Sequence, residues 1–273
     1  MREKFSVLLS LYAKERPAYL RAALDSLLAQ TVLADEWVIV EDGPLTPELY
    51  AVLEEYETAR PGLIRRVPLA ENQGLGLALR AGVPECSYER IARMDTDDIC
   101  LPDRFEKQMA QMDADPGLDV CGGQIDEFED TPDKIVASRR VPLTDAEIKA
   151  YQKKRDGFNH VSVMFKKSAV LRAGNYQSAP LMEDTLLWCH MILAGAKCAN
   201  LPDVLVWVRI GKDMYERRGG WAYFKKYREG RRAVRKTGYI SAWDYGVSIA
   251  AQFVVALIPG GLRAFVFKKI LHR

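Results

Sequence analysis

Three aspartates stand within four positions of RMDTDD, residues 93–98, directly after a short apolar run. Asp95, Asp97 and Asp98 repel one another unless a cation or a proton offsets their charge. Mg²⁺ and Mn²⁺ prefer oxygen ligands, and Mg²⁺ usually binds one or two carboxylates together with phosphate oxygens. The segment therefore predicts a site for a metal ion and a diphosphate. A solvated loop of turn-forming or helix-capping aspartates is the alternative.

Polar residues also follow two other apolar runs. Asp42 comes directly after EWVIVE, where its carboxylate can accept hydrogen bonds from a base or a ribose, although acids are common in such turns. Asn72 and Gly74 lie in ENQGLG, where the backbone can approach a phosphate. These residues do not form a dinucleotide-binding fingerprint, because Leu79 occupies the position of the third glycine.

A second acidic pair, Glu183 and Asp184, stands in MEDTLLW at the start of a helical pattern. Such a carboxylate can take the proton from an attacking hydroxyl, but acids also stabilise the first turn of a helix through its dipole. His160 can line an acceptor or diphosphate site, although a single histidine beside a strand is more often structural. Arg217 and Arg218 can close on a diphosphate, or they belong to a solvated basic face.

Alternating strand and helix patterns supply the scaffold for these residues. Strands are expected at 5–12, 36–43, 63–70 and 90–95, and helices at 17–28, 47–60, 74–82 and 102–115. This order predicts a parallel sheet with helices on both faces. Ligands of such sheets bind beyond the carboxyl ends of the strands, where Tyr12, Asp42, Asn72 and Asp95 are expected to meet.

The second half of the chain alternates less regularly. Strands are expected at 118–128, 160–167 and 204–210, and a helix at 182–195. We therefore expect an α/β domain at residues 1–211, divided into halves at 1–98 and 99–211, and a basic helical region at 212–273.

Charge is distributed unevenly, although the net charge is only +2. Residues 212–273 hold 14 Lys and Arg against 4 Asp and Glu, so residues 1–211 sum to −8. A basic tail suggests an anionic partner such as a membrane surface or nucleic acid. The apolar run within 241–261 is about fourteen residues long, below the ~20 needed to span a bilayer. The tail is expected to lie on a membrane, or to pack on the sheet as a helical cap.

The cysteines and the N-terminus indicate a cytosolic setting. There are five cysteines, an odd number, and no CxxC, so the pattern indicates neither a disulfide framework nor a zinc site and fits a reducing compartment. The N-terminal apolar run is short, ends in charge and lacks a cleavage-like site, so it is not typical of a signal peptide.

The ordered series of segments resembles family 2 glycosyltransferases of the GT-A fold, over roughly residues 4–210. The segments are VLLSLY, VIVEDGP, ENQGLGLALRAG, IARMDTDDICLPDRFEKQ, NHVSVMFKKSAVLRAGNYQ and MEDTLLW. The likeness is closest to bacterial enzymes that build capsule, exopolysaccharide and O-antigen units. It implies a nucleotide-sugar donor, usually a UDP-sugar, Mg²⁺ or Mn²⁺, and inversion at the anomeric carbon. Residues 1–98 would then bind the nucleotide sugar and 99–211 the acceptor.

The resemblance also implies roles for individual residues. Asp42 would contact the uracil, Asp97 would be the principal metal ligand, and Asp184 would be the catalytic base with Glu183 beside it. Asp95 would contact the ribose or bridge to the metal. The remaining donor-side contacts would come from Tyr12, Asn72, Gly74, Thr96, Arg217 and Arg218, and His160 would lie on the acceptor side. The sequence departs from the family at Glu41, Pro44, Arg80 and Val161, which leaves the exact sugar and nucleotide open.

These expectations define a leading hypothesis and two alternatives. The leading hypothesis is an inverting glycosyltransferase whose saccharide acceptor is carried on a polyprenyl diphosphate, working peripherally at the inner face of the cytoplasmic membrane. A nucleotidyltransferase is the first alternative, but SLYAKERP lacks the glycines expected after its first strand. The second is a nucleic-acid-binding module that uses the basic tail; it leaves the acids at the strand ends unexplained, so no nucleic-acid partner is expected.

Overall fold

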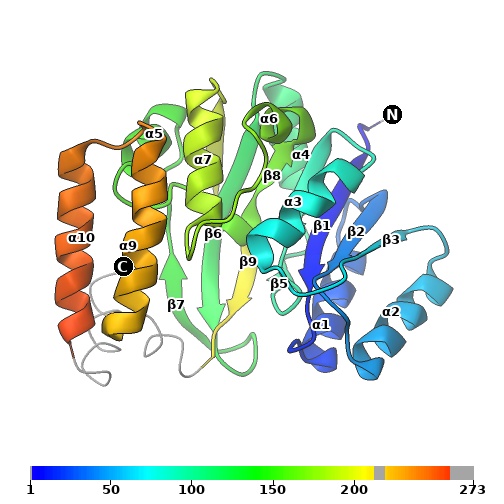
Figure 1. Ribbon diagram of the computed structural model, residues 1–273. Coiled ribbons are helices and arrows are strands. Elements are labelled where there is room, and N and C mark those ends of the chain that lie inside the picture. The colour runs from blue at the N-terminus through cyan, green and yellow to red at the C-terminus, as the bar shows by residue number, and fades with distance from the viewer. Residues whose placement is uncertain (1, 212–218, 259–273) are drawn as a thin grey trace.

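The computed structural model describes residues 2–211 and 219–258. Its first half alternates strands and helices as the sequence pattern predicts (Figure 1). The elements are β1 (Phe5–Leu11), α1 (Pro17–Leu28), β2 (Glu36–Glu41), α2 (Pro47–Ala59), β3 (Ile64–Pro68), α3 (Leu75–Glu85) and β4 (Arg90–Met94). Proline at the first position of α1 and of α2 fits the start of a helix, where no backbone N–H is needed.

The second half holds more elements than the pattern predicts. They are β5 (Ile99–Cys100), α4 (Arg104–Ala114), β6 (Val120–Phe128), β7 (Ile135–Arg139), α5 (Asp145–Gln152), the 3₁₀ helix η1 (His160–Ser162), β8 (Met164–Lys166), α6 (Lys167–Arg172), α7 (Glu183–Leu193), β9 (Cys198–Arg209), α9 (Gly220–Lys236) and α10 (Ala242–Leu257). The strand expected at 160–167 shortens to β8, because the backbone N–H of Ser162 bonds the Asn159 carbonyl (2.8 Å) and closes the η1 turn.

The strands of the described chain form one mixed sheet in the order β3-β2-β1-β4-β8-β6-β9-β5, with β7 paired to β6. The neighbours β3, β2, β1 and β4 are parallel, so their carboxyl ends share one edge. Beyond β4, the strand β8 runs antiparallel to both β4 and β6, whereas β6 and β9 are parallel. The predicted α/β fold is therefore confirmed, and every antiparallel pair among the described strands includes a strand of its second half.

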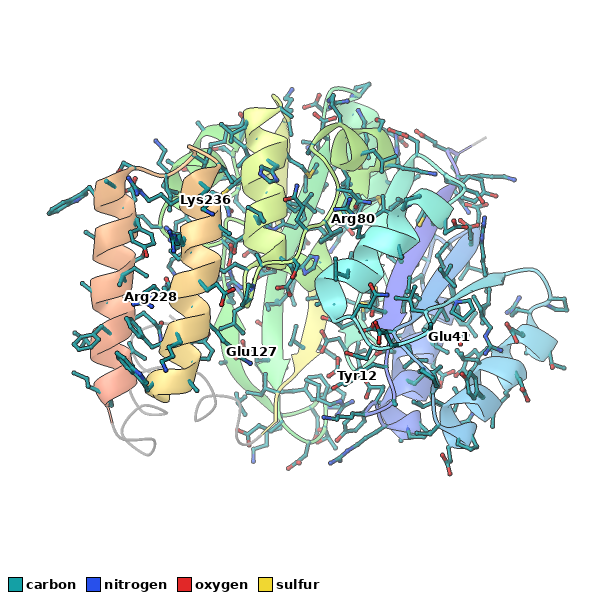
Figure 2. All side chains as sticks on the ribbon, in the orientation of Figure 1. Tyr12, Glu41, Arg80, Glu127, Arg228 and Lys236 are labelled. Carbon is teal, nitrogen blue, oxygen red and sulfur yellow. The ribbon has the colours of Figure 1, made fainter. Side chains whose placement is uncertain are left out.

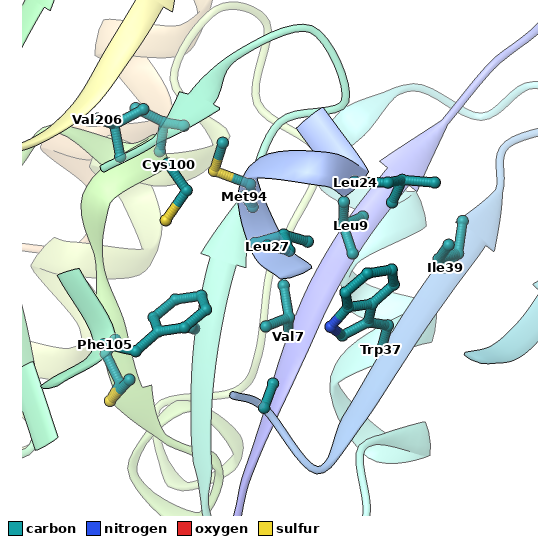
Figure 3. Close-up of a cluster of buried hydrophobic side chains, with 14 of the residues drawn as sticks. Val7, Leu9, Leu24, Leu27, Trp37, Ile39, Met94, Cys100, Phe105 and Val206 are labelled. Atoms are coloured by element: carbon teal, nitrogen blue, oxygen red, sulfur yellow. The ribbon is translucent and has the colours of Figure 1, made fainter. Parts of the chain in front are cut away.

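Side chains alternate between the two faces of the sheet and build a core on each. Val7, Leu9, Trp37 and Ile39 face α1, α2 and α4, where Leu24, Leu27 and Phe105 meet them (Figure 3). Leu8, Val38 and Val40 point to the other face, against α3, α5, α6 and α7. Because these strands are buried on both faces, they read in sequence as continuous apolar runs. Full burial of each large apolar side chain contributes about 1.5–3 kcal/mol.

The C-terminal helices lie at the end of the molecule opposite α2 (Figure 1). Helix α9 packs on α7 through Val234, and its Gly230 allows close approach to the Pro180 carbonyl, only 2.2 Å from where a Cβ would stand. Helix α10 packs on α9 but contains no buried residue, and Trp243 is 79% exposed. Helix α9 is thus a cap on the domain, while α10 presents apolar side chains to the surroundings. No helix in the described ranges combines the length and hydropathy needed to cross a membrane.

Candidate functional site

Asp42 ties the end of β2 to the loop before α3. Its carboxylate accepts hydrogen bonds from the backbone N–H groups of Gln73 (2.7 Å) and Gly74 (3.0 Å). The Asn72 side-chain amide donates to the Asp42 carbonyl (3.1 Å). Both Asp42 carboxylate oxygens thus already accept a backbone hydrogen bond, and the residue is buried. Its first role in the structure is to shape the loop at the edge of the sheet, and contact with a nucleotide base stays a prediction.

Two glycines make this loop possible. Gly43 has a φ of 84°, and a Cβ there would stand 2.7 Å from the Asn72 backbone nitrogen. Gly74 has a φ of 87° and caps the start of α3. Other residues rarely adopt this backbone conformation, so both positions favour glycine. Asn72 and Gly74 therefore stand beside Asp42, as the sequence predicts.

Glu41, one of the departures from the family pattern, is also engaged. Its carboxylate bonds the guanidinium of Arg66 on β3, and that guanidinium lies 5.1 Å from the centre of the Tyr50 ring. Glu41 is 3% exposed. The Glu41–Arg66 ion pair therefore links β2 to β3 inside the domain. Tyr12, at the end of β1, is 43% exposed near the same edge (Figure 2).

Asp95 is paired with Arg93, a residue that the sequence analysis did not single out. The Arg93 Nη1 donates to Asp95 Oδ2 at 2.6 Å, and Nη2 bonds the other carboxylate oxygen. The guanidinium is 2% exposed. Residues two apart on a strand point to the same face. An arginine two positions before an aspartate at the end of a buried strand could therefore have predicted this ion pair from the sequence. This bidentate pair compensates the charge of Asp95.

Asp97 has no paired cation in the described part of the chain. Burial, followed by the nearby Asp95 and Glu15, raises the pKa of Asp97 to about 7. Thr96 is buried, and its hydroxyl donates to Glu15 (3.0 Å), which holds this third carboxylate close to Asp97. A cation would relieve the repulsion, so the donor set fits a divalent metal held by Asp97 with help from Asp95. Within the described ranges no three acidic, histidine or cysteine side chains converge as a ready-made metal cage.

Asp98 has a structural task. Its Oδ1 accepts a hydrogen bond from the backbone N–H of Arg209 at 2.7 Å, and the residue is 2% exposed. The Arg209 guanidinium in turn donates to the Asp97 carbonyl (3.0 Å) and lies 4.0 Å from the centre of the Tyr19 ring. Asp98 thus joins the aspartate turn to the end of β9, which agrees with its alternative assignment as a turn residue.

Arg104 of α4 forms hydrogen bonds from inside the core to backbone next to the aspartate turn. The fully buried guanidinium donates to the carbonyls of Arg93 (2.8 Å) and Val163 (3.2 Å), and to the Gln108 side chain (3.0 Å). Burial lowers the pKa of Arg104. The buried carbonyl groups of Arg93 on β4 and of Val163 after η1 are thus satisfied by one donor inside the core.

Glu183 and Asp184 begin α7, where the sequence predicts a helix start. Burial, Asp156 and Glu183 together raise the pKa of Asp184 to about 8, and burial raises the pKa of Glu183. A Cβ on Gly76 of α3 would stand 2.8 Å from the Glu183 Cβ, so the starts of α3 and α7 touch. Arg93 and Asp95 both act electrostatically on Glu183. The two acidic clusters of the sequence therefore lie near one another.

Asp156 is a further acid at this place that the sequence analysis missed. Its carboxylate accepts a hydrogen bond from the Thr185 hydroxyl at 2.5 Å, one residue beyond Asp184. The Asp156 carbonyl accepts from Arg139 (3.1 Å). Asp156 lies in the long polar stretch between β6 and η1, where no pattern of spacing marks it. Its importance arises only from the fold, which brings it against α7.

His160 is held by aromatic neighbours. Its Nε2 lies 2.8 Å from the Tyr176 hydroxyl, and its ring packs edge-on against Trp188, with ring centres 5.8 Å apart. Burial, with a smaller effect of Arg93, lowers the pKa of His160 well below its usual value, so the ring is neutral. It lines the cleft described next.

A cleft of about 850 Å³ runs along the second half of the domain. Its lining includes Asp95 and Asp98 of the aspartate turn, together with His160, Asp156 and Thr185. Residues of α9 and α10 form another part of its wall; α9 stands next to the part of the sheet that carries Glu127, and α10 lies on the outer side of α9 (Figure 2).

The other predicted site residues do not line this cleft. Tyr12, Asp42, Asn72 and Gly74 belong to the strand-end group, Thr96 and Asp97 to the aspartate turn, and Glu183 and Asp184 to the start of α7. Arg217 and Arg218 fall outside the described residues.

Comparison with known proteins identifies the chain. The family model for Glycosyl transferase family 2 matches residues 6–176. The amylovoran biosynthesis glycosyltransferase AmsE of Erwinia amylovora is 41% identical, over 97% of this chain and 98% of its own. An Escherichia coli enzyme named UDP-Gal:alpha-D-GlcNAc-diphosphoundecaprenol beta-1,3-galactosyltransferase is 34% identical, over 99% of this chain and 97% of its own.

Solved structures share the fold. The mannosyltransferase PcManGT of Pyrobaculum calidifontis, in complex with GDP-Man and Mn²⁺, superposes with a TM-score of 0.64 at 15% identity, over 100% of this chain and 82% of its own. Residues 1–349 of S. aureus TarS, in complex with UDP-GlcNAc, give 0.64 at 16% identity, over 84% and 66%. These likenesses show the GT-A type of fold. The chain is thus a glycosyltransferase and belongs to family 2.

Proposed function

We propose that this enzyme moves a sugar from a UDP-sugar to a hydroxyl of a lipid-linked saccharide, with inversion, during assembly of a bacterial surface polysaccharide. The observation that carries the proposal is the position of Arg93, which pairs with Asp95 of the aspartate turn and acts electrostatically on Glu183 at the start of α7. One buried cation thus influences both a carboxylate that we assign to the donor side and one that we assign to the acceptor side.

Asp184 is the residue we assign as general base. It would take the proton from the acceptor hydroxyl as that oxygen attacks the anomeric carbon and the bond to the nucleoside diphosphate breaks. A carboxylate with a raised pKa near 8 is a stronger proton acceptor than an ordinary aspartate. One displacement inverts the anomeric centre, so one base suffices. Asp156 holds Thr185 beside it through the 2.5 Å hydrogen bond.

The donor side would be held by the aspartate turn. Asp97, helped by Asp95, would hold Mg²⁺ or Mn²⁺, and the ion would offset the charge of the departing diphosphate. The bidentate bond from Arg93 keeps the Asp95 carboxylate fixed at the edge of the sheet. Asn72, Gly74 and Tyr12 would line the nucleotide, and Arg217 and Arg218 remain proposed contacts of the diphosphate.

The donor and acceptor classes are proposed from the relatives. The Escherichia coli relative is named for UDP-Gal and for an acceptor on diphosphoundecaprenol. The TarS complex contains UDP-GlcNAc. The exposed apolar side chains of α10 support work at a membrane surface. We therefore propose a peripheral location on the inner face of the cytoplasmic membrane.

A thermal-shift screen of UDP-, GDP- and dTDP-sugars with and without Mn²⁺ tests the donor class. We expect a UDP-sugar to raise the melting temperature only when Mn²⁺ is present, and Asp97→Asn to abolish that dependence. Lack of stabilisation by every nucleotide sugar would contradict the proposal.

Transfer assays test the base. We expect Asp184→Asn to bind donor normally and to lose transfer by about 10²–10⁴-fold, the usual contribution of a general base. Near-normal turnover of Asp184→Asn would place the base elsewhere.

A further inference from the structure

Arg231 of α9 is a buried cation that the proposed chemistry leaves unused. It is 2% exposed and lines the cleft. Its Nε donates to the Ser248 hydroxyl (3.1 Å) and its Nη2 to the Lys153 carbonyl, both uncharged groups. Among the described residues, no carboxylate lies within ion-pair distance of this guanidinium. A buried guanidinium without a counter-charge is unfavourable, so it points to an anion that binds there.

The carboxylates around Arg231 already have other partners. Asp156 accepts from the Thr185 hydroxyl, and Asp244 of α10 accepts from both the hydroxyl and the backbone N–H of Ser241 in a capping box. Neither forms an ion pair with Arg231, although Arg231, after the hydrogen bonds from Ser241 and together with Lys153, helps to lower the pKa of Asp244. The position beside the guanidinium therefore suits an anionic ligand.

Further cations line the same cleft. Arg139 donates to the carbonyls of Asp156 (3.1 Å) and Phe158 (3.4 Å), and Lys154 and Arg155 project from the end of α5. In the described part of the chain, none of these three forms an ion pair. With Arg231 they place four cationic side chains here against two carboxylates, those of Asp156 and Asp244, and this excess of positive charge suits two phosphate groups.

The adjoining wall of the cleft is apolar. Trp243, Val247, Ala251 and Val255 line it from α10 at intervals of four residues, so they form one stripe along the helix. A stripe of this length extends about 18 Å at 1.5 Å per residue. Val247 is 51% exposed, which leaves the stripe available to a ligand. The cleft therefore combines a cationic section with an extended hydrocarbon-binding section.

We propose that this section binds the carrier part of the acceptor. Arg231, Arg139, Lys154 and Arg155 bind the diphosphate, and the α10 stripe holds the first isoprene units of the lipid. The acceptor sugar then lies toward Thr185 and Asp156, beside Asp184. This inference rests on the proposed function and adds the carrier-binding residues to it.

Direct binding of farnesyl diphosphate, measured by titration calorimetry on the full chain, tests the subsite. We expect wild type to bind farnesyl diphosphate at least tenfold more tightly than either inorganic pyrophosphate or farnesol. Arg231→Gln should weaken farnesyl diphosphate binding at least tenfold. Arg232→Gln changes an exposed neighbour on α9 that does not line the cleft; it is the matched control, and its affinity for farnesyl diphosphate should stay within twofold of wild type.

Two further variants, both at exposed positions where a substitution should not prevent folding, test the diphosphate-binding half and the lipid-binding half of the subsite separately. Arg155→Gln, at an exposed position, should weaken binding of both farnesyl diphosphate and pyrophosphate, whereas Val247→Asp should weaken binding of farnesyl diphosphate alone. Unchanged affinity in Arg231→Gln and Arg155→Gln would overturn the inference. So would competition between UDP and farnesyl diphosphate, because it would put the lipid diphosphate in the donor site.

The same titrations separate this inference from the proposed function. If wild type binds a UDP-sugar with Mn²⁺ but the variants leave farnesyl diphosphate binding unchanged, the carrier subsite is wrong and the donor assignment stands. If no nucleotide sugar binds but the farnesyl diphosphate results hold, the donor assignment fails and the subsite stands.

Discussion

Arg93 and Asp95 form a bidentate ion pair at the carboxyl end of β4, with Nη1 of the arginine 2.6 Å from Oδ2 of the aspartate. The guanidinium is buried while the carboxylate is 34% exposed, so the arginine fixes the aspartate and leaves it accessible from the cleft. The pair explains how one acid of the turn can stand close to Asp97 without adding its full charge. The geometry of the aspartate turn therefore depends on the planar Arg93 guanidinium, which bonds both carboxylate oxygens of Asp95.

Arg93→Lys should therefore impair donor binding even though it keeps the charge. A lysine ammonium cannot reproduce the two parallel hydrogen bonds, and Asp95 would lose its fixed orientation. We expect the donor KM and the Mn²⁺ concentration needed for half-maximal activity each to rise about tenfold, equivalent to ~1.4 kcal/mol. The control is Arg65→Lys on β3, which alters an exposed ion pair with Glu85 of α3 and should change neither quantity. Equal kinetics of Arg93→Lys and wild type would contradict this role.

The raised pKa of Asp184 predicts a pH dependence of activity. The general base must be unprotonated to accept the hydroxyl proton, so kcat/KM should increase with pH and level off above a pKa near 8. Asp156→Asn removes one of the charges that raise this pKa and should move the acidic limb of the profile to lower pH. Profiles measured at subsaturating acceptor check both expectations. An unshifted limb in Asp156→Asn would exclude this electrostatic coupling.

Asp184 should also make stability depend on pH. Its pKa is about 3.9 when unfolded and about 8 in the native protein, so between these values the native state holds a proton that the unfolded chain has released. Raising the pH through this window therefore destabilises the native state. Asp184→Asn cannot ionise and should melt at a higher temperature than wild type at pH 9, with the difference vanishing near pH 4. Each kcal/mol corresponds to roughly 2–4 °C for a chain of this size. A difference that is independent of pH would contradict the assignment.

Local patterns were sufficient to predict much of the framework. The continuous apolar runs of β1, β2 and β4 reflect burial on both faces. The acids that follow β2 and β4 and the amide that follows β3 share one edge of the sheet because these strands are parallel. The helix at Glu183 follows from its apolar periodicity and its acidic first turn. The position of the aspartate turn, Asn72 and Glu183 could thus be predicted from the sequence.

Partnerships between distant residues could not be predicted in the same way. Thr185 and Asp156 are 29 positions apart, and Arg209 and Asp98 are 111 apart, so no spacing rule links them. Arg231 reads in sequence as one of many charges on a basic helix, and its burial depends on how α9 packs against α7. Helix α5 was missed although Thr144 and Glu147 form a capping box, because its polar sequence has a weak apolar pattern.

Gly76 links the donor and acceptor sides through packing, and this contact can be tested. Gly76 is the second residue of α3, and alanine within a helix is normally more stable than glycine by up to about 1 kcal/mol. At Gly76 the added Cβ would stand 2.8 Å from the Cβ of Glu183, so α7 must shift its first turn, including Asp184. We expect Gly76→Ala to reduce kcat by at least tenfold without the usual gain in stability.

Gly246→Ala is the matched control, because nothing lies within 4 Å of its Cβ position on α10. It should raise the melting temperature and leave kcat unchanged. Full activity in Gly76→Ala would show that the start of α7 tolerates displacement and that its position does not govern the proposed base.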